Sequence, residues 1–583
     1  MIKKEDISNF FNLEAEAAKK SWEALMKLPI NDRIRKRKAI KDVFLDRGYR
    51  EMSDENFVLL KVSMGLNLAD FKEGEGLLLH KEGTSIGIKC ALNSFIGDEG
   101  IILEVFPPKM PANLEDYFDV PLILDRDMVD LRDSVYYSFL SSLNNDPDFW
   151  EHCLLNDPHS PKIEDRDKSE EALDDVFQIE LLPAQREAII NSLAANDYYL
   201  IQGPPGTGKS FVLSLIIFLE IVVKFHKIVI IGPNHMEINN TLQQVYDRFA
   251  PLKDVIPMPL VAKVGQSYNR PLLKDEEGNF LVDNVNYLNV PYVNSTELPG
   301  VIGITPHSLY SRRGRGLKCD TLIIDEAGQM TIPLALMGMI KAEKVILAGD
   351  HKQLPPIITS EEVPDYMQKS AFEALMTDDN YTLLDTSFRM CEPLCEYVSD
   401  LFYDSKVKAK KQGCGDMVIC ADPLYSFDKP VVIHQVEDNG CQASDKEAEY
   451  IVNTIVGFLK EGVPAKEIAV LAPFRAQAAT IRRGFRKCKD ISEEDKSKLV
   501  ADTVDKMQGQ EREVIIYSFT AGDPDYISEM ADFLYKPNKL NVAFSRAKSK
   551  LIIVGNFDKI LENAGDGFPH IKGMLNHKNV TMV

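Results

Sequence analysis

The sequence has few of the features that mark secreted or membrane-bound proteins. Its first residues, MIKKEDISNF, contain no apolar leader, and its nine cysteines among 583 residues follow no regular spacing. The missing leader argues against secretion, and scattered cysteines are typical of a reducing compartment. We therefore expect a cytoplasmic protein, or a nuclear one if the source is eukaryotic.

A long hydrophobic run is also missing. The most apolar stretch, SFVLSLIIFLEIVV (210–223), is interrupted by Glu220 and is shorter than the ~18 residues that a membrane span needs. It predicts a helix buried against a sheet, and we expect no membrane partner. Hydrophobic residues make up 45% of the chain and charged residues 27%, which is typical of a globular protein. The sequence contains no low-complexity tract.

Positive charge is in deficit. The chain has 67 Lys and Arg against 89 Asp and Glu, a formal net charge of −22. This argues against a protein that coats nucleic acid through its overall field, although a local basic channel stays open. The densest basic cluster, RIRKRKAIK (33–41), is interpreted as a solvated lead-in to the strands that follow; a phosphate contact or a nuclear signal is the alternative.

The length of the chain predicts two to four domains. Residues 156–178 are polar, acidic and contain proline, which predicts a solvated linker. In residues 1–155, helical segments at about 5–28 and 127–143 flank the β-like runs 56–63, 75–81, 84–93 and 100–106. This pattern predicts a small β-barrel carried on helices.

After the linker, short apolar strands alternate with helical patterns. Nearly continuous apolar runs occur at 227–232, 321–327, 344–350, 467–474, 513–520 and 551–556. Such strands suit parallel sheets that are covered by helices on both faces. The predicted fold class is therefore α/β, with two parallel-sheet domains in tandem at 179–382 and 383–583.

The stretch GPPGTGKS (203–210) fits the phosphate-loop pattern G-x-x-x-x-G-K-S. Its glycines let backbone N–H groups turn toward an anion, and its lysine can reach the β- and γ-phosphates of a nucleoside triphosphate. An apolar strand (197–202) precedes the loop and a helix follows it, whose positive N-terminus favours an anion. A plain Gly/Pro turn is the alternative, which the lysine and serine disfavour. The predicted nucleotide-binding residues here are Gly203, Pro204, Pro205, Gly206, Thr207, Gly208, Lys209 and Ser210.

The segment IIDEAGQ (323–329) places two adjacent carboxylates at the end of an apolar strand, where ligands collect in open α/β sheets. Asp325 and the Ser210 hydroxyl can hold Mg²⁺, and Glu326 can orient or deprotonate the attacking water. Alone, such a pair is often an exposed turn. Together with the phosphate loop it favours hydrolysis of a nucleoside triphosphate.

The segment GDHKQLPP (349–356) also follows an apolar strand. Gln353 can contact the γ-phosphate, and Asp350 can relay the nucleotide state to neighbouring segments. By itself the segment could be an ordinary loop closed by two prolines. The other phosphate-directed motifs favour the functional interpretation.

The order of these and later motifs resembles the superfamily 1B helicases, in particular the branch of the nonsense-mediated-decay RNA helicase and the immunoglobulin mu-binding helicase. The resemblance covers about the last two thirds of the chain. The segments that carry it are LLPAQREAI (181–189), GPPGTGKS, GPN (232–234), DEAGQ (325–329), GDHKQLPP, SFRM (387–390), APFRAQ (472–477), TVDKMQGQE (503–511) and NVAFSRAK (541–548).

The resemblance implies two RecA-like domains with ATP and Mg²⁺ in the cleft between them. Arg389 and Arg546 would approach the γ-phosphate from the second domain as arginine fingers. Gln185 would read the adenine edge and Phe388, in place of the commoner tyrosine, would stack on the ring. Residues expected near the ribose and phosphates are Gly509 and Glu511.

The same resemblance implies single-stranded nucleic acid as a partner. A lone Asn or Thr at a strand end is as readily a cap or turn residue, and GPNHMEINN (232–240) departs from the small residues usual after its motif. The sequence leaves open whether the strand is DNA or RNA. The expected strand contacts are Asn234, Thr305, Pro473, Arg475 and Thr503.

Closure of the cleft in each hydrolysis cycle would shift one domain along the strand, with 5′ to 3′ polarity in this branch. The predicted function is an ATP-dependent helicase that unwinds duplexes. The alternative is a nucleic-acid-stimulated ATPase that remodels protein–nucleic-acid complexes with little unwinding. A nucleotide kinase or switch would leave SFRM, TVDKMQGQE and NVAFSRAK unexplained. We expect a monomer that is targeted by its barrel or by a protein partner.

A group of cysteines follows the finger arginine. Their spacing lacks paired C-x-x-C and no histidine lies among them, so a zinc or iron–sulfur site is disfavoured. The segment MCEPLCEY (390–397) is interpreted as the start of a helix. The role of the group stays open; its members are Cys391, Cys395, Cys414 and Cys420.

Overall fold

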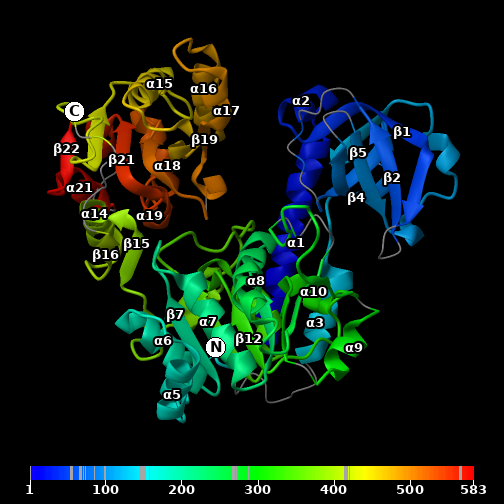
Figure 1. Ribbon diagram of the computed structural model, residues 1–583. Helices are drawn as coiled ribbons and strands as arrows, with labels where there is room; N and C mark the ends of the chain where they lie inside the picture. The colour runs from blue at the N-terminus through cyan, green and yellow to red at the C-terminus, as the bar shows by residue number, and fades with distance from the viewer. Residues whose placement is uncertain are drawn as a thin grey trace.

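The computed structural model describes residues 2–52, 57–64, 69, 71, 74–84, 86–96, 100–143, 153–156, 158–265, 270, 272–286, 288–297, 299–411, 418, 420–507, 509–563 and 568–583. Figure 1 shows a β-barrel at the upper right, a first α/β unit at the bottom and a second α/β unit at the upper left. Each helix in the described part of the chain is too short or too polar to span a bilayer.

The barrel confirms the small β-barrel that the sequence predicts. Its strands close in the order β1-β2-β5-β4-β3-β6, and every neighbouring pair is antiparallel. Alternating Leu, Ile and Val side chains fill its interior. The strands are β1 (Ala39–Met52), β2 (Val58–Ser63), β3 (Gly76–Lys81), β4 (Gly87–Ile96), β5 (Gly100–Val105) and β6 (Leu122–Arg126).

The basic cluster 33–41 leads into the barrel, because β1 begins inside it at Ala39. Arg33 is buried and forms an ion pair with Asp125 of β6. His80 Nε2 lies 2.8 Å from Asp125 Oδ2. At least one charge of the cluster therefore serves the barrel itself and is not a solvated lead-in residue.

A long helix, α1 (Lys4–Met26), connects the first α/β unit to the barrel (Figure 1). The Glu14 carboxylate accepts hydrogen bonds from Thr359 N (2.9 Å) and Ser360 N (2.8 Å) of the α/β unit. Further along the helix, Trp22 Nε1 donates to the Arg126 carbonyl of β6 over 3.1 Å. The shorter helices at this junction are α2 (Ile30–Arg35), the π-helical turn η3 (Arg132–Tyr136) and α3 (Tyr137–Ser142).

The first α/β unit has one parallel sheet in the order β10-β9-β11-β8-β12-β13-β7-β14. A separate hydrophobic cluster packs on each face of it, as expected for strands that are apolar on both sides. Its strands are β7 (Tyr198–Gln202), β8 (Lys227–Ile231), β9 (Leu260–Lys263), β10 (Asp283–Asn284), β11 (Gly300–Gly303), β12 (Thr321–Ile324), β13 (Lys344–Gly349) and β14 (Tyr381–Leu383). Its helices are α6 (Pro183–Ala194), α7 (Lys209–Val222), α8 (His235–Phe249), α9 (Val290–Ser295), α10 (Pro306–Tyr310), α11 (Ile332–Met339), α12 (Asp365–Gln368) and α13 (Ala371–Leu375).

The second α/β unit has a parallel sheet in the order β19-β18-β20-β21-β17-β22. The predicted fold class is thus confirmed. The strands are β17 (Val431–Gln435), β18 (Ile468–Ala472), β19 (Val500–Thr503), β20 (Arg512–Ser518), β21 (Ala547–Gly555) and β22 (Val580–Met582), beside a separate pair, β15 (Thr386–Cys391) and β16 (Lys408–Lys411). The helices are α14 (Glu392–Phe402), α15 (Asp445–Lys460), α16 (Arg475–Lys487), α17 (Glu493–Lys498), α18 (Pro524–Leu534), α19 (Pro537–Phe544), α20 (Phe557–Asn563) and α21 (Pro569–Asn576).

The segment expected to be a solvated linker contains a helix, α5 (Arg166–Val176). Leu173 of α5 is buried in the core of the first α/β unit, and Asp174 accepts from Arg186 Nη1 of α6 over 2.6 Å. The high charge of the segment obscured its few inward-facing apolar residues. The domain boundaries drawn from the sequence stay predictions.

Candidate active site

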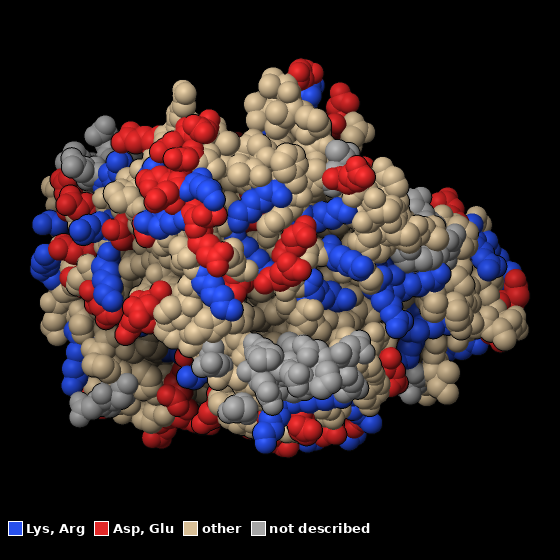
Figure 2. Space-filling model, turned by 90° about the horizontal axis from the view of Figure 1, so that it is seen from below, with Lys and Arg blue, Asp and Glu red and all other residues tan. Residues whose placement is uncertain are grey.

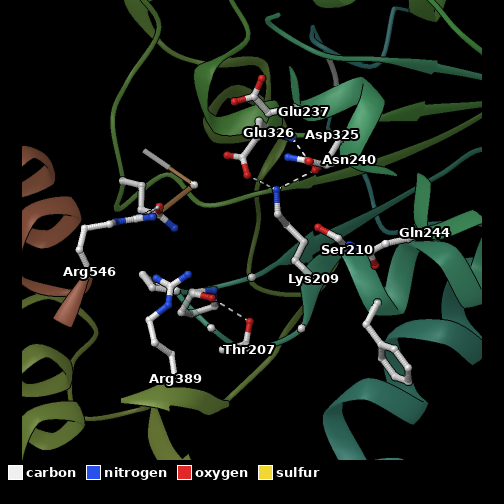
Figure 3. A pocket seen from close by; sticks show the side chains of 18 residues that line it. Thr207, Lys209, Ser210, Glu237, Asn240, Gln244, Asp325, Glu326, Arg389 and Arg546 are labelled. Atoms are coloured by element: carbon white, nitrogen blue, oxygen red, sulfur yellow. Dashed lines mark hydrogen bonds and ion pairs between the residues drawn. The ribbon is translucent and has the colours of Figure 1, made fainter. Parts of the chain in front are cut away.

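A cavity of about 350 Å³ is lined by residues of both α/β units. The first unit contributes the whole loop 203–210 and the carboxyl ends of β12 and β13. The second unit contributes Arg389, Gly509 and Arg546, and in Figure 3 both arginines point from their own elements toward the loop. Of the residues that the sequence predicts for ATP binding and hydrolysis, most line this cavity.

The loop 203–210 has the backbone of a phosphate cradle. Gly206 (φ 73°) and Gly208 (φ 83°) adopt left-handed conformations that other residues rarely adopt, and α7 begins directly afterwards at Lys209. A Cβ atom on Gly203 would lie 2.8 Å from Lys209 Cβ, so only glycine fits there. Backbone N–H groups and a helix N-terminus that converge in this way suit the phosphates of ATP.

Lys209 lies between the two predicted catalytic carboxylates. Its Nζ atom is 2.7 Å from Asp325 Oδ1 and also hydrogen-bonds Glu326 Oε1 (Figure 3). Burial lowers the pKa of Lys209, but the two carboxylates outweigh burial and raise it well above its usual value. The lysine is therefore charged at neutral pH, as its predicted role toward the phosphates requires.

The two carboxylates are held differently. Asp325 is buried, and its Oδ2 atom accepts from the Thr241 hydroxyl of α8 over 2.6 Å. Glu326 adopts a left-handed backbone conformation (φ 53°), and its Oε2 atom accepts from Gln329 Nε2 over 3.0 Å. Asp325 thus has a fixed oxygen for a cation, whereas Glu326 is half-buried at the cavity wall, where a water molecule can reach it.

Gln353 links the two units at the cavity. Its Nε2 atom donates to Asp350 Oδ2 over 2.9 Å, and its Oε1 atom accepts from Arg546 Nη2 over 3.3 Å. Arg546 is buried, and burial followed by the nearby Arg389 lowers its pKa to about 9. The guanidinium therefore stays charged at neutral pH and lies in a poorly solvated position, where it attracts an anion strongly.

Arg389 is joined to the phosphate loop through the backbone of β15. Phe388 N donates to the Gly206 carbonyl over 2.8 Å, and the Ser387 hydroxyl donates to the Pro205 carbonyl over 2.9 Å. The Arg389 side chain pairs with Glu511 (Nε to Oε2, 2.5 Å). As the predicted arginine finger, Arg389 would have to leave Glu511 to reach a phosphate.

Two family models, each described as an AAA domain, match residues 300–361 and 367–558. Relatives that are named helicases match most of its length, and the chain is therefore a superfamily 1 helicase. It is an ATP-hydrolysing enzyme, as its phosphate loop predicts.

This helicase is similar to the DNA polymerase alpha-associated DNA helicase A of Schizosaccharomyces pombe, at 26% identity over 84% of the chain and 82% of that protein. It is 25% identical to an uncharacterized ATP-dependent helicase of Methanocaldococcus jannaschii, over 64% of the chain and 67% of that protein. The human DNA replication ATP-dependent helicase/nuclease DNA2 is 24% identical over 92% of the chain, which spans 48% of that longer protein. Among solved structures, the Arterivirus nonstructural protein 10 helicase is 13% identical over 94% of this chain and 83% of that one, with a TM-score of 0.37.

Three residues expected at the nucleotide do not line the cavity of the helicase. Gln185 is buried, and its amide donates to the Thr207 carbonyl (3.4 Å) and accepts from Leu182 N (3.2 Å). Phe388 is 48% exposed, and Glu511 is paired with Arg389. Their roles toward the base, ribose and phosphates stay predictions.

The cavity has lining residues that the sequence analysis missed. Glu237, Asn240 and Gln244 lie on α8 at spacings of three and four residues, and therefore on one face of the helix, with Phe211 of α7 nearby in the lining. Burial, and then the carboxylates of Glu326 and Asp325, raise the pKa of Glu237 to about 7. The departure of GPNHMEINN from the family pattern was the available signal, because Glu237 occurs within it.

The predicted strand-contact residues lie outside the cavity. Asn234 is exposed and caps α8, with its Oδ1 atom accepting from Met236 N over 2.9 Å. Thr305 precedes α10, and its hydroxyl lies 2.9 Å from Ser308 Oγ. Pro473 and Thr503 are buried at the ends of β18 and β19, whereas Arg475 is exposed at the start of α16. Their contacts with nucleic acid stay predictions.

The cysteine group shows no metal geometry in the part of the chain that is described, where no three His, Cys, Asp or Glu residues could hold an ion together. Cys391 and Cys395 are buried, and the predicted helix is α14. Cys420 Sγ lies 3.3 Å from the Asp422 carbonyl. Cys414 lies outside the described residues.

Proposed function

We propose that the helicase moves along single-stranded nucleic acid in the 5′ to 3′ direction, driven by ATP hydrolysis, and separates duplexes in its path. The observation that carries the proposal is the cavity shared by the two α/β units, with the phosphate loop on one wall and Arg389 and Arg546 on the other. Hydrolysis then depends on how the two units stand to each other. Such dependence is what couples a chemical step to movement of one unit against the other.

The residues of the first unit fit ATP with Mg²⁺. Ser210 and Asp325 would hold the ion, which neutralises phosphate charge when it is bound. Lys209 would leave the carboxylates to contact the β- and γ-phosphates. Glu326 would then be free to orient or deprotonate the attacking water.

The residues of the second unit would complete the site. Arg389 and Arg546 would stabilise the charge that develops on the transferred phosphoryl group, and Gln353 would contact it from the first unit. Gln185 and Phe388 would hold the base from outside the described cavity lining. We take the two units to be domains at 179–382 and 383–583.

For the strand we propose single-stranded DNA, because the Schizosaccharomyces pombe relative is named a DNA helicase and the human relative a DNA replication helicase/nuclease. The net charge of −22 is compatible with a local basic surface. Figure 2 shows Lys and Arg side chains among Asp and Glu on one face, with a group of Lys and Arg at the right of the view. The proposed contacts are Asn234, Thr305, Pro473, Arg475 and Thr503; we further propose a monomer that is targeted by its barrel or by a protein partner.

The proposal is tested by steady-state ATP hydrolysis without polymer, with single-stranded DNA and with single-stranded RNA of matched sequence. We expect DNA to stimulate the rate most. Lys209→Ala should lower kcat about 10²- to 10³-fold, because a preorganised charge at the phosphates is removed. The exposed Lys253→Ala is the matched control and should keep the wild-type rate. Equal rates with all three conditions would contradict the coupling to nucleic acid.

Duplexes with a 5′ or a 3′ single-stranded tail test unwinding and polarity. Unwinding of the 5′-tailed duplex alone is the expected result. Stimulated hydrolysis without strand separation would instead support the second candidate, an ATPase that remodels protein–nucleic-acid complexes.

A further inference from the structure

The segment 350–353 of the first α/β unit is held from both sides. Asp350 is buried at the end of β13, and its Oδ1 atom accepts from Gln202 Nε2 (3.2 Å) and Lys352 N (3.1 Å) of its own unit. Its Oδ2 atom accepts from Gln353 Nε2 (2.9 Å). One more donor to Oδ2 comes from the second unit.

That donor is the Tyr403 hydroxyl, 2.6 Å from Asp350 Oδ2. Tyr403 follows the last residue of α14 and is buried. Its hydroxyl also accepts from Asn541 Nδ2 of α19 over 2.8 Å. Neither Tyr403 nor Asn541 lines the nucleotide cavity, so neither is placed to touch ATP.

Helix α19 holds the backbone of the same segment directly. Asn541 Nδ2 donates to the Lys352 carbonyl over 2.8 Å. Asn538 Nδ2, one turn earlier, donates to the carbonyls of His351 (2.8 Å) and Gln353 (2.5 Å). Three consecutive carbonyls of the first unit therefore accept from one helix of the second.

The same chain segment carries the arginine finger. Arg546 comes five residues after Asn541, and its Nε atom donates to the Val542 carbonyl of α19 over 3.0 Å. Its Nη2 atom donates to Gln353 Oε1 over 3.3 Å. Hydrogen bonds through Asp350, Tyr403 and Asn541, together with the chain from Asn541 to Arg546, therefore form a closed ring. The position of Gln353 and that of Arg546 are thus fixed by one set of contacts between the units.

We propose that Tyr403 and Asn541 are positioning residues that align Gln353 with Arg546 for ATP hydrolysis. Neither residue touches ATP; both set the geometry of the groups that do. The inference rests on the proposed roles of Gln353 and Arg546 at the γ-phosphate. A displacement of about 1 Å in such groups is enough to slow a reaction strongly.

The test is Tyr403→Phe, which removes one hydroxyl and keeps the ring. We expect kcat for ATP hydrolysis to fall about tenfold, because a buried carboxylate oxygen and a buried amide each lose a partner. The KM for ATP should change less than about twofold, since the cavity lining is intact. Tyr397→Phe is the matched control: Tyr397 lies on α14, just before Tyr403 in the chain, is buried, and donates to the Met574 carbonyl of its own unit (3.3 Å). It should keep the wild-type kcat.

A purely structural role would lower the melting temperature in both tyrosine variants and leave kcat of the folded protein unchanged. That result, or an equal loss of kcat in both, would overturn the inference. The double variant Asn541→Leu with Tyr403→Phe should have a kcat no lower than that of the slower single variant, because both substitutions break the same set of contacts. If Tyr403→Phe does not fold, Asn538→Ala takes its place, with the same split between kcat and KM expected.

Every variant is assayed with and without single-stranded DNA. If no polymer stimulates the wild type, the proposed coupling to nucleic acid fails. The ratio of kcat between Tyr403→Phe and wild type without polymer still decides whether Tyr403 positions the site.

Discussion

The nucleotide cavity and the predicted strand contacts differ in how completely they are assembled. At the cavity, Lys209 lies against Asp325 and Glu326, and Gln353 is already joined to Arg546. Two of the predicted strand-contact residues have local partners instead: Asn234 caps α8, and the Thr305 hydroxyl lies 2.9 Å from Ser308 Oγ. The predicted phosphate ligands form a compact set of charges that the fold brings together, whereas the predicted strand contacts are spread over several elements.

Buried acidic groups also differ between the cavity and the second unit. At the cavity, Lys209 pairs with the carboxylates of Asp325 and Glu326. In the second unit, Glu447 of α15 is fully buried and accepts from Thr520 N (3.0 Å) and the Ser518 hydroxyl. Gln477 of α16, two residues after Arg475, donates to the same hydroxyl over 2.9 Å. Neutral hydrogen bonds therefore support the element that carries the exposed candidate strand contact.

The largest effect is expected from the second wall of the cavity. Arg546→Ala should lower kcat about 10³-fold or more, because an arginine finger acts mainly on the transition state. Binding of ATP should persist, since the phosphate loop is intact, and this is checked by titration with a fluorescent ATP analogue. A loss of kcat of less than about tenfold would show that hydrolysis does not depend on this residue of the second unit.

The second prediction concerns the pH dependence of stability. Burial raises the pKa of Glu447 to about 8 from a usual value of 4.5, although its hydrogen bonds oppose this. A carboxyl group with a raised pKa in the fold stabilises it fully below about pH 4.5, and this contribution is lost as the pH rises to about 8. Relative to Glu447→Gln, the wild type should lose up to about 1.4 kcal/mol of unfolding free energy per pH unit in that window.

Urea unfolding of the two proteins at pH 5.5, 6.5 and 7.5 measures this difference. Glu461→Gln, at the exposed end of the same helix, is the matched control and should show no such slope against wild type. A pH-independent difference for Glu447→Gln would contradict the raised pKa of this group.

The smallest effect is expected on the strand side. Arg475→Ala should weaken binding of single-stranded DNA a few-fold and reduce the salt dependence of the affinity by about one charge, because one phosphate contact is lost. Arg483→Ala is exposed on the same helix and is the control. ATP hydrolysis at saturating DNA should be unchanged. An unaltered salt dependence of the affinity would show that Arg475 does not contact the strand.

Local sequence predicts most of the cavity because its parts are short patterns with a fixed backbone. The phosphate loop needs left-handed glycines and a following helix, and these are present in eight residues at 203–210. The strands that precede Asp325 and Gln353 are apolar on both faces, so the sequence predicts them as readily. By contrast, β1 and α5 were obscured, because charged residues cover their exposed faces and hide the apolar pattern beneath.

The sequence by itself determined the fold class, the phosphate loop and the identity of the candidate catalytic groups, since each follows from residues close together in the chain. Only the tertiary structure decided that Glu237, Asn240 and Gln244 line the cavity and that Tyr403 reaches Asp350 across the two units. Helix faces and interdomain contacts depend on how separate elements pack. No local pattern specifies which hydroxyl will meet a carboxylate 53 residues away.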